Sequence, residues 1–149
     1  MMLNKARQIL QKFYGYEDFR PGQKKVVDSL LNKNDTVAIM PTGAGKSICF
    51  QIPALLFEGV TLVISPLISL MKDQVDSLRQ LGIAAVYINS SVSKAQLYKD
   101  LQDISAGFYK IIYIAPERLT SEYLPDSFKN LNISMVAVDE AHCLSQWGH

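Results

Sequence analysis

Long apolar runs are missing from this chain of 149 residues. The longest ones, such as residues 60–64, fall far short of the roughly 20 apolar residues that a helix needs to span a bilayer. The first residues also lack the apolar stretch of a secretory signal. The sequence therefore predicts no membrane partner, and the cytoplasm is the expected location.

Cysteine and net charge are also scarce. Cys49 and Cys143 have no CxxC spacing, so we interpret them as reduced, buried thiols and expect no disulfide and no zinc in this chain. With 15 basic and 14 acidic side chains the formal net charge is +1. That balance excludes a strongly basic protein that coats nucleic acid, and any polyanion must be bound locally.

Short apolar runs separated by helical segments fill the chain after Asp35. Because these runs are nearly all apolar and do not alternate, we expect both faces of the sheet to be covered by helices. The predicted fold class is α/β, with a largely parallel sheet of about five or more strands. Two helices, 4–13 and 21–31, are expected before it. The expected strands are 36–40, 60–65, 84–88, 110–115 and 135–139.

A glycine-rich loop, Met40-Pro-Thr-Gly-Ala-Gly-Lys-Ser47, follows the first expected strand and precedes a helix. Glycines let backbone N–H groups close around phosphates, and the helix N-terminus supplies partial positive charge. Lys46 would reach the outer phosphates and Ser47 would coordinate Mg²⁺. Met40 replaces the first glycine of the strict motif. The predicted phosphate-binding residues are Thr42, Gly43, Ala44, Gly45, Lys46 and Ser47.

An acidic pair ends the last apolar run. Asp139 would hold the Mg²⁺ shell together with Ser47, through water, and Glu140 would orient or deprotonate the attacking water. A protein that only binds nucleotide has no need of a second carboxylate there. The loop and the pair together predict hydrolysis of a nucleoside triphosphate, with Lys46, Asp139 and Glu140 as catalytic residues.

Five motifs follow one another along the chain: GYEDFRPGQ at 15–23, MPTGAGKSI at 40–48, SPLISLMKDQ at 65–74, YIAPERL at 113–119 and DEAHCLSQWGH at 139–149. With them the chain resembles, nearly from end to end, the first motor domain of RecQ-type DNA helicases. Ala44 departs from the family, which usually has a third glycine there. The resemblance implies a RecA-like phosphate-loop domain at 34–149, incomplete at its C-terminal end, with 1–33 as a helical part of the same domain.

The resemblance also implies an adenine pocket made by Tyr16, Arg20 and Gln23. A glutamine amide can bond an adenine edge bidentately, and Tyr16 or Arg20 can stack on the ring. ATP is therefore expected in preference to GTP. His142 is expected to bridge motifs within the ATPase site, as a catalytic residue and not as a metal ligand.

Two segments are expected to touch single-stranded DNA. Ser65, Pro66 and Leu67 follow a strand, at the end where α/β folds place ligands. Trp147 and His149 follow the acidic motif, and Trp147 resembles part of the family's DNA-sensing aromatic loop, where stacking on a base is worth about 1–3 kcal/mol. The alternative for Trp147 is packing on its own domain.

The resemblance implies a parent protein that is an ATP-dependent, 3′ to 5′ DNA helicase acting in DNA repair and recombination. Such a protein would be cytoplasmic and nucleoid-associated in a bacterium, or nuclear in a eukaryote. It would partner single-stranded and duplex DNA, and a second RecA-like domain would supply an arginine finger. That domain is absent before the end at His149, so we expect this chain alone to bind nucleotide weakly and not to unwind DNA.

Three alternatives stay open. An RNA helicase of the DEAD or DEAH groups shares the domain and much of the acidic motif, although residues 20–23 and 145–149 argue against it. A non-catalytic module that binds nucleotide or docks a partner would need only the fold. A small-molecule kinase is weakened by Glu140. Unwinding polarity, preferred DNA structure and oligomeric state are not given by these residues.

Overall fold

The structure is a computed structural model, and it describes residues 2–40, 45–119, 128–129 and 131–139. It divides into two compact units, Met1–Phe57 and Glu58–His149, and each unit is described by itself. Several predicted site residues lie outside the described part of the chain: Thr42, Gly43, Ala44, Glu140, His142, Trp147 and His149.

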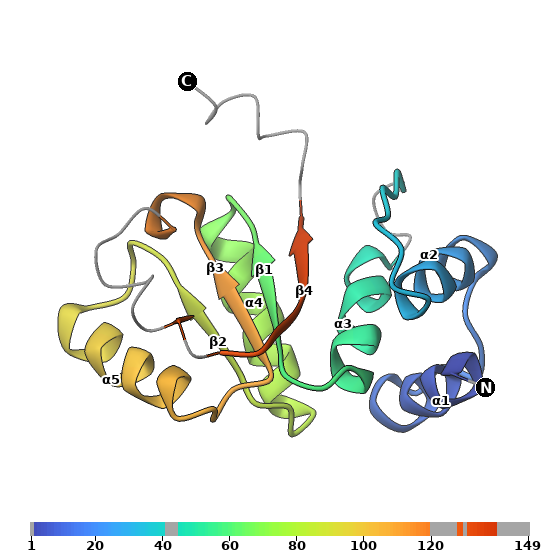
Figure 1. Cartoon of the computed structure of the whole chain (residues 1–149), viewed down its shortest axis with the longest axis horizontal. Helices are drawn as coiled ribbons and strands as arrows, with labels where there is room; N and C mark the ends of the chain where they lie inside the picture. The colour runs from blue at the N-terminus through green and yellow to red at the C-terminus, as the bar shows by residue number, and fades with distance from the viewer. Residues whose placement is uncertain (1, 41–44, 120–127, 130, 140–149) are drawn as a thin grey trace. The chain divides into compact units, whose positions relative to one another are not determined.

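The first unit is helical. Helix α1 (Met2–Ile9) continues into the π-helical turn η1 (Leu10–Tyr14), and α2 (Pro21–Leu31) and α3 (Lys46–Leu56) follow (Figure 1). Helix α2 begins at Pro21 because the fixed φ of proline suits the first position of a helix, and both predicted bounds of this helix are confirmed. The three helices share one apolar core, made by Ala6, Leu10, Phe19, Val27, Leu31 and Ile52.

The predicted strand at 36–40 is wrong, because these residues have no regular secondary structure. The side chains of Val37 and Ile39 are 92% and 95% exposed. At its start the Thr36 hydroxyl lies 2.8 Å from that of Ser29 on α2, and at its end Sδ of Met40 lies 3.9 Å from Sγ of Cys49 on α3. An apolar run becomes a strand only when a neighbouring strand takes its backbone hydrogen bonds, and the run itself says nothing about that neighbour.

The second unit contains a four-stranded sheet in the order β2-β3-β1-β4. Its strands are β1 (Val60–Ile64), β2 (Ala85–Ile88), β3 (Ile111–Ile114) and β4 (Ile133–Val138). All three pairings are parallel, so the four arrows in Figure 1 run towards the same edge. Four of the five predicted strands are thus confirmed, with bounds that differ by at most two residues.

Helices α4 (Ile68–Gln80) and α5 (Lys94–Ser105) cover opposite faces of this sheet. Leu101 and Ile104 of α5 pack in one core with Ile112 of β3. On the other face the Tyr113 hydroxyl donates a hydrogen bond to Oε1 of Gln74 on α4. Consecutive strand residues point to opposite faces, so the two contacts place the two helices on opposite sides.

Strand β4 is covered less completely than the other three. It stands at one edge of the described sheet, paired only with β1, and Val136 and Val138 are 53% and 42% exposed. Within the described part of the second unit, the expectation of helices on both faces holds for β1, β2 and β3 and is left untested for β4. The fold class is confirmed as α/β with a parallel sheet, whereas a fifth strand is not found among the described residues.

The expected start of α5 is also confirmed. The Ser93 hydroxyl accepts a hydrogen bond from the N–H of Gln96 across 3.2 Å, which satisfies one of the amides that a helix leaves without a partner in its first turn. Among the helices of the described residues, none combines the length and the apolar character that crossing a membrane requires.

Candidate functional site

The predicted phosphate loop enters α3 through Gly45. Its backbone is left-handed, with φ +75° and ψ +43°, and Lys46 is the first residue of the helix. Lys46 and Ser47 are both half-buried in its first turn. The N-cap residue, Gly45, has no side chain that could cap this helix N-terminus, and the amides and dipole of a helix start favour an anion there. That the loop before this helix binds phosphate stays a prediction.

Gln23 is buried and joins two predicted parts of the nucleotide site. Its Oε1 accepts a hydrogen bond from the backbone N–H of Arg20 across 3.0 Å. Its Nε2 donates to the carbonyl oxygen of Gly45 across 3.2 Å. Only 5% of Gln23 is exposed. The structure therefore brings Arg20, Gln23 and Gly45 together, and the amide predicted to bind adenine also bonds the last glycine of the predicted phosphate loop.

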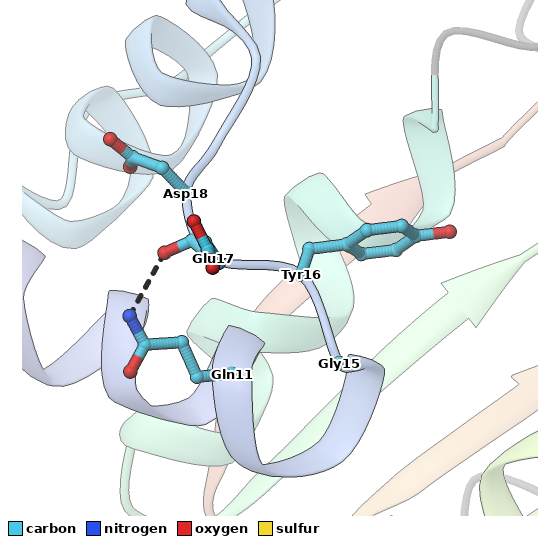
Figure 2. Close-up of a pocket in the computed structure, with 5 residues that line it drawn as sticks. All are labelled: Gln11, Gly15, Tyr16, Glu17 and Asp18. Atoms are coloured by element: carbon cyan, nitrogen blue, oxygen red, sulfur yellow. Dashed lines mark hydrogen bonds between the residues drawn. The ribbon is translucent and has the colours of Figure 1, made fainter.

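Tyr16 lies apart from that contact, in the open turn after η1, and is 56% exposed. The turn and Gln11 line a hollow of about 610 Å³. Figure 2 shows the Tyr16 ring directed away from Gln11 and Asp18, while Gln11 Nε2 donates to the carbonyl of Glu17 across 2.9 Å. An exposed ring on a turn is available for stacking on a base, which is compatible with its predicted role.

Asp18 also lines this hollow. Its carboxylate accepts hydrogen bonds from the N–H of Phe19 and from Nε of Arg7, at 2.8 and 3.0 Å. These contacts, led by the backbone N–H of Phe19, lower the pKa of Asp18. The side chain is 60% exposed, and an exposed ion pair of this kind contributes little to stability. Its consequence is local, because it anchors the turn that carries Tyr16 to α1.

Cys49 lies one turn into α3 and is buried. Its Sγ is 3.8 Å from the carbonyl oxygen of Gly45 and 3.9 Å from Sδ of Met40. Burial raises the pKa of this thiol to about 11. The expectation of a buried thiol is confirmed for Cys49, whereas Cys143 lies outside the described residues.

In the second unit, the predicted DNA-binding segment 65–67 follows β1. Ser65 is buried, and its hydroxyl accepts a hydrogen bond from the N–H of Leu67 at 3.5 Å. Pro66 is half-buried and Leu67 is 39% exposed. The surface of this loop is thus formed by Pro66 and Leu67, while Ser65 shapes the turn. Their contact with DNA stays a prediction.

Asp139 comes directly after β4 and is half-buried. Its N–H donates to the carbonyl of Ile64 across 2.9 Å, so the backbone hydrogen bonding of the sheet extends to this residue. Asp139 and the segment 65–67 therefore both follow strand ends at the same edge of the sheet. Lys46 and Ser47 belong to the first unit, and their predicted partnership with Asp139 stays a prediction.

Sequence reasoning missed a buried polar residue at the same edge, Asn89, which follows β2 and is 0% exposed. It also missed the contact between Gln23 and Gly45. A signal for Asn89 was present, because Asn-Ser-Ser directly after an apolar run is typical of a turn in which the asparagine side chain bonds the backbone two residues on. The described residues contain no group of three or more potential metal ligands among His, Cys, Asp and Glu.

Comparison with known proteins agrees with the resemblance that the motifs indicate. The model of the DEAD/DEAH box helicase family matches residues 20–149. The chain is 53% identical, over 149 residues, to a protein of Bacillus subtilis (strain 168) named ATP-dependent DNA helicase RecQ. Proteins of the same name from Pasteurella multocida (strain Pm70) and Haemophilus influenzae are 49% and 46% identical over 144 residues.

These matches cover 97–99% of this chain but only part of each relative. The chain spans 25% of the Bacillus subtilis protein and 23% of each of the other two.

Proposed function

Because this chain belongs to the DEAD/DEAH box helicase family, we propose that it is the ATP-binding part of a RecQ-type helicase that acts on DNA. Three relatives that match nearly the whole chain, at 46% to 53% identity, are named ATP-dependent DNA helicases. The proposed parent protein couples ATP hydrolysis to movement along single-stranded DNA and to unwinding of a duplex. A second RecA-like domain is part of the proposal.

The observation that carries the proposal is the turn at Gly45. A left-handed glycine leads directly into Lys46 and Ser47 in the first turn of α3. A helix start of this kind offers amides, and with the Lys46 ammonium and the Ser47 hydroxyl it supports the proposal that phosphates of a nucleotide bind here. Lys46 would neutralise the outer phosphates.

For Mg²⁺, the support comes from the chemistry of the predicted ligands. Ser47 offers a hydroxyl and Asp139 a carboxylate, and both are hard oxygen donors of the kind that Mg²⁺ prefers. The ion would neutralise charge on the transferred phosphate. Within the chain, Ser47 would orient the ion, Asp139 would hold its water shell, and Glu140 would act on the attacking water.

Selectivity for adenine is proposed to come from Tyr16, Arg20 and Gln23. Gln23 is held by Arg20 and Gly45, and a carboxamide has two N–H donors and an oxygen with two lone pairs. We propose that this amide meets the adenine edge. Tyr16 is exposed enough to stack on the ring.

The test is calorimetry of this chain with Mg²⁺ and ATP or GTP. The proposal predicts that ATP binds more tightly than GTP and that Lys46→Ala abolishes both signals. Lys5→Ala removes an equal charge from an exposed position on α1 and is the matched control. Equal binding by wild type and Lys46→Ala would overturn the proposal.

A second measurement separates the DNA helicase from the RNA helicase. In a longer chain that carries the second motor domain, single-stranded DNA should stimulate ATP hydrolysis and RNA of the same sequence should not. Stimulation by RNA alone would favour the RNA alternative. If Lys46→Ala keeps every partner in a pull-down but loses ATP binding, the non-catalytic docking module gains support.

A further inference from the structure

Tyr14 joins the end of η1 to the helix that follows the predicted phosphate loop. Its hydroxyl donates a hydrogen bond to Oε1 of Gln51 on α3 across 2.8 Å, 37 residues further along the chain. Tyr14 is half-buried and packs against the core of the first unit, and only 4% of Gln51 is exposed. Burial raises the pKa of the Tyr14 hydroxyl, so the group keeps the proton that it donates. The bond is a contact between η1 and α3 that is largely sheltered from water.

One end of this bond lies beside the turn that is predicted to bind the base. Tyr14 is the last residue of η1, and Gly15 follows it with a left-handed backbone at φ +75°. Tyr16 comes next, and its exposed ring extends from the turn (Figure 2). The turn is also tied back to η1, because Nε2 of Gln11 donates to the carbonyl oxygen of Glu17. The place of the Tyr16 ring therefore depends on where η1 lies.

The other end lies close to the residues that are predicted to bind phosphate and Mg²⁺. Gln51 is four positions after Ser47 in α3, and residues four apart are neighbours on one side of a helix. The bond between Gln23 and Gly45 holds the residue before α3, whereas the bond from Tyr14 holds the helix itself. The first turn of α3 is therefore fixed relative to η1.

A ligand that binds at two places gains affinity when the protein keeps those places at a fixed separation. Once one end of the ligand is bound, the other end binds as if at a high local concentration, provided that the spacing is right. A protein that has to order its two subsites during binding loses part of this gain. A nucleotide is such a ligand, because its base and its phosphates are bound by different segments of the predicted site.

We propose that Tyr14 is a positioning residue for ATP, because its hydrogen bond to Gln51 holds the turn that carries Tyr16 in a fixed place relative to the first turn of α3. The inference rests on the proposed function, since it assumes that phosphates bind at the start of α3 and adenine at Tyr16. Tyr14 itself touches no part of the nucleotide and acts through Tyr16.

The experiment is calorimetry of this chain with MgATP and with tripolyphosphate and Mg²⁺. Tyr14→Phe keeps the ring and removes the hydroxyl. It should weaken ATP binding about fivefold, the size expected for one lost hydrogen bond, and leave the affinity for tripolyphosphate, which has no base, unchanged. Tyr98→Phe removes a hydroxyl from an exposed ring on α5 and should change neither affinity. The decisive quantity is the ratio of the ATP affinity to the tripolyphosphate affinity.

Tyr16→Ala separates a positioning role from a structural one. Without the ring that contacts the base, the place of the turn no longer matters to ATP. The double variant Tyr14→Phe with Tyr16→Ala should therefore bind ATP within about twofold of Tyr16→Ala alone. A role in stability alone would lower the melting temperature of Tyr14→Phe and leave the ratio of the two affinities at its wild-type value.

Gln51→Met covers the case in which Tyr14→Phe does not fold, as judged by circular dichroism. It removes the acceptor of the same bond, keeps an unbranched side chain of similar length, and should also lower the affinity ratio about fivefold. An unchanged ratio in Tyr14→Phe, or in Gln51→Met if Tyr14→Phe is unfolded, overturns the inference. A further fivefold loss of ATP binding on adding Tyr14→Phe to Tyr16→Ala also overturns it.

The same measurements separate this inference from the proposed function. If wild type binds ATP more tightly than tripolyphosphate and Tyr14→Phe keeps that ratio, the inference fails while the proposed nucleotide site stands. If wild type binds neither ligand, or binds both equally well, the proposed phosphate or adenine site fails and the inference fails with it.

Discussion

The Nε2 of Gln23 donates a hydrogen bond to the carbonyl oxygen of Gly45 across 3.2 Å, 22 residues further along the chain. The same amide accepts from the N–H of Arg20. A residue that the sequence assigns to the base of a nucleotide therefore also braces the turn assigned to its phosphates. One side chain therefore links the two predicted halves of the nucleotide site.

We expect Gln23→Ala to weaken binding of inorganic tripolyphosphate as well as ATP, both with Mg²⁺. Without the amide, the Gly45 carbonyl loses a buried partner, and the phosphate loop loses an anchor worth roughly 1 kcal/mol, or about fivefold in affinity. Calorimetry with the two ligands measures the effect. Tyr16→Ala is the control, because an exposed ring that stacks on the base should affect ATP only. If tripolyphosphate binds Gln23→Ala as tightly as wild type, the bond to Gly45 has no role in phosphate binding.

Gly45→Ala should destabilise the chain more than Gly82→Ala. Both glycines have positive φ, +75° and +84°, which costs an alanine about 1–2 kcal/mol. A methyl group at Gly82 meets nothing within 4 Å, whereas one at Gly45 collides with the Gln23 amide. Urea unfolding followed by circular dichroism gives both free energies. Equal losses at the two positions would show that the Gln23 side chain moves away without cost.

We predict that the buried thiol of Cys49 makes the folded state less stable at alkaline pH. Burial raises the pKa of its thiol from 9.0 to about 11, so the folded state keeps a proton that the unfolded state releases first. The stabilisation by the protonated thiol is complete below about pH 9 and is lost as the pH rises towards 11. The free energy of unfolding of wild type should fall more steeply over this range than that of Cys49→Ala. If the free energy of unfolding depends on pH in the same way in both proteins, the raised pKa of the Cys49 thiol is contradicted.

Tyr113→Phe should lower the free energy of unfolding by about 1–2 kcal/mol. The Tyr113 hydroxyl donates a hydrogen bond to Oε1 of Gln74, on the face of the sheet that α4 covers, and Tyr113 is only 1% exposed. Removal of the hydroxyl takes a partner from the Gln74 amide. Tyr98→Phe is the matched control, since Tyr98 is 67% exposed and should change stability by less than about 0.5 kcal/mol. Thermal unfolding of both variants tests the difference, and a similar effect in both would rule out a special role for the buried bond.

Local signals were sufficient for most helices and strands of this chain. Pro21 begins α2 and Ser93 caps α5 at the positions predicted, because proline and serine act on the backbone within a few residues of themselves. The apolar runs at β1 and β3 are confirmed as strands for a similar reason. The order β2-β3-β1-β4 could not be predicted in this way, because it depends on which distant strands pair.

The segment 36–40 shows where local reasoning failed. Thr-Val-Ala-Ile-Met favours a strand by composition, yet Val37 and Ile39 are almost fully exposed and the residues pair with no strand. Gln23 shows the opposite case. On sequence alone its polar side chain on a helix fits a surface position or a base contact, whereas the structure buries it against Gly45.

The sequence by itself determined the kind of chemistry available to this protein. The residue types and spacing of the phosphate loop and the acidic pair, and the motifs that place the chain among helicases, are properties of short stretches and can be read without coordinates. Only the tertiary structure decided which polar groups meet: Gln23 with Gly45, Asn89 with Ser91 and Arg118, and Tyr113 with Gln74. Three of these contacts join residues that are 22 to 39 positions apart in the sequence: Gln23 with Gly45, Asn89 with Arg118, and Gln74 with Tyr113. Such contacts arise from packing of the whole chain, which no local pattern encodes.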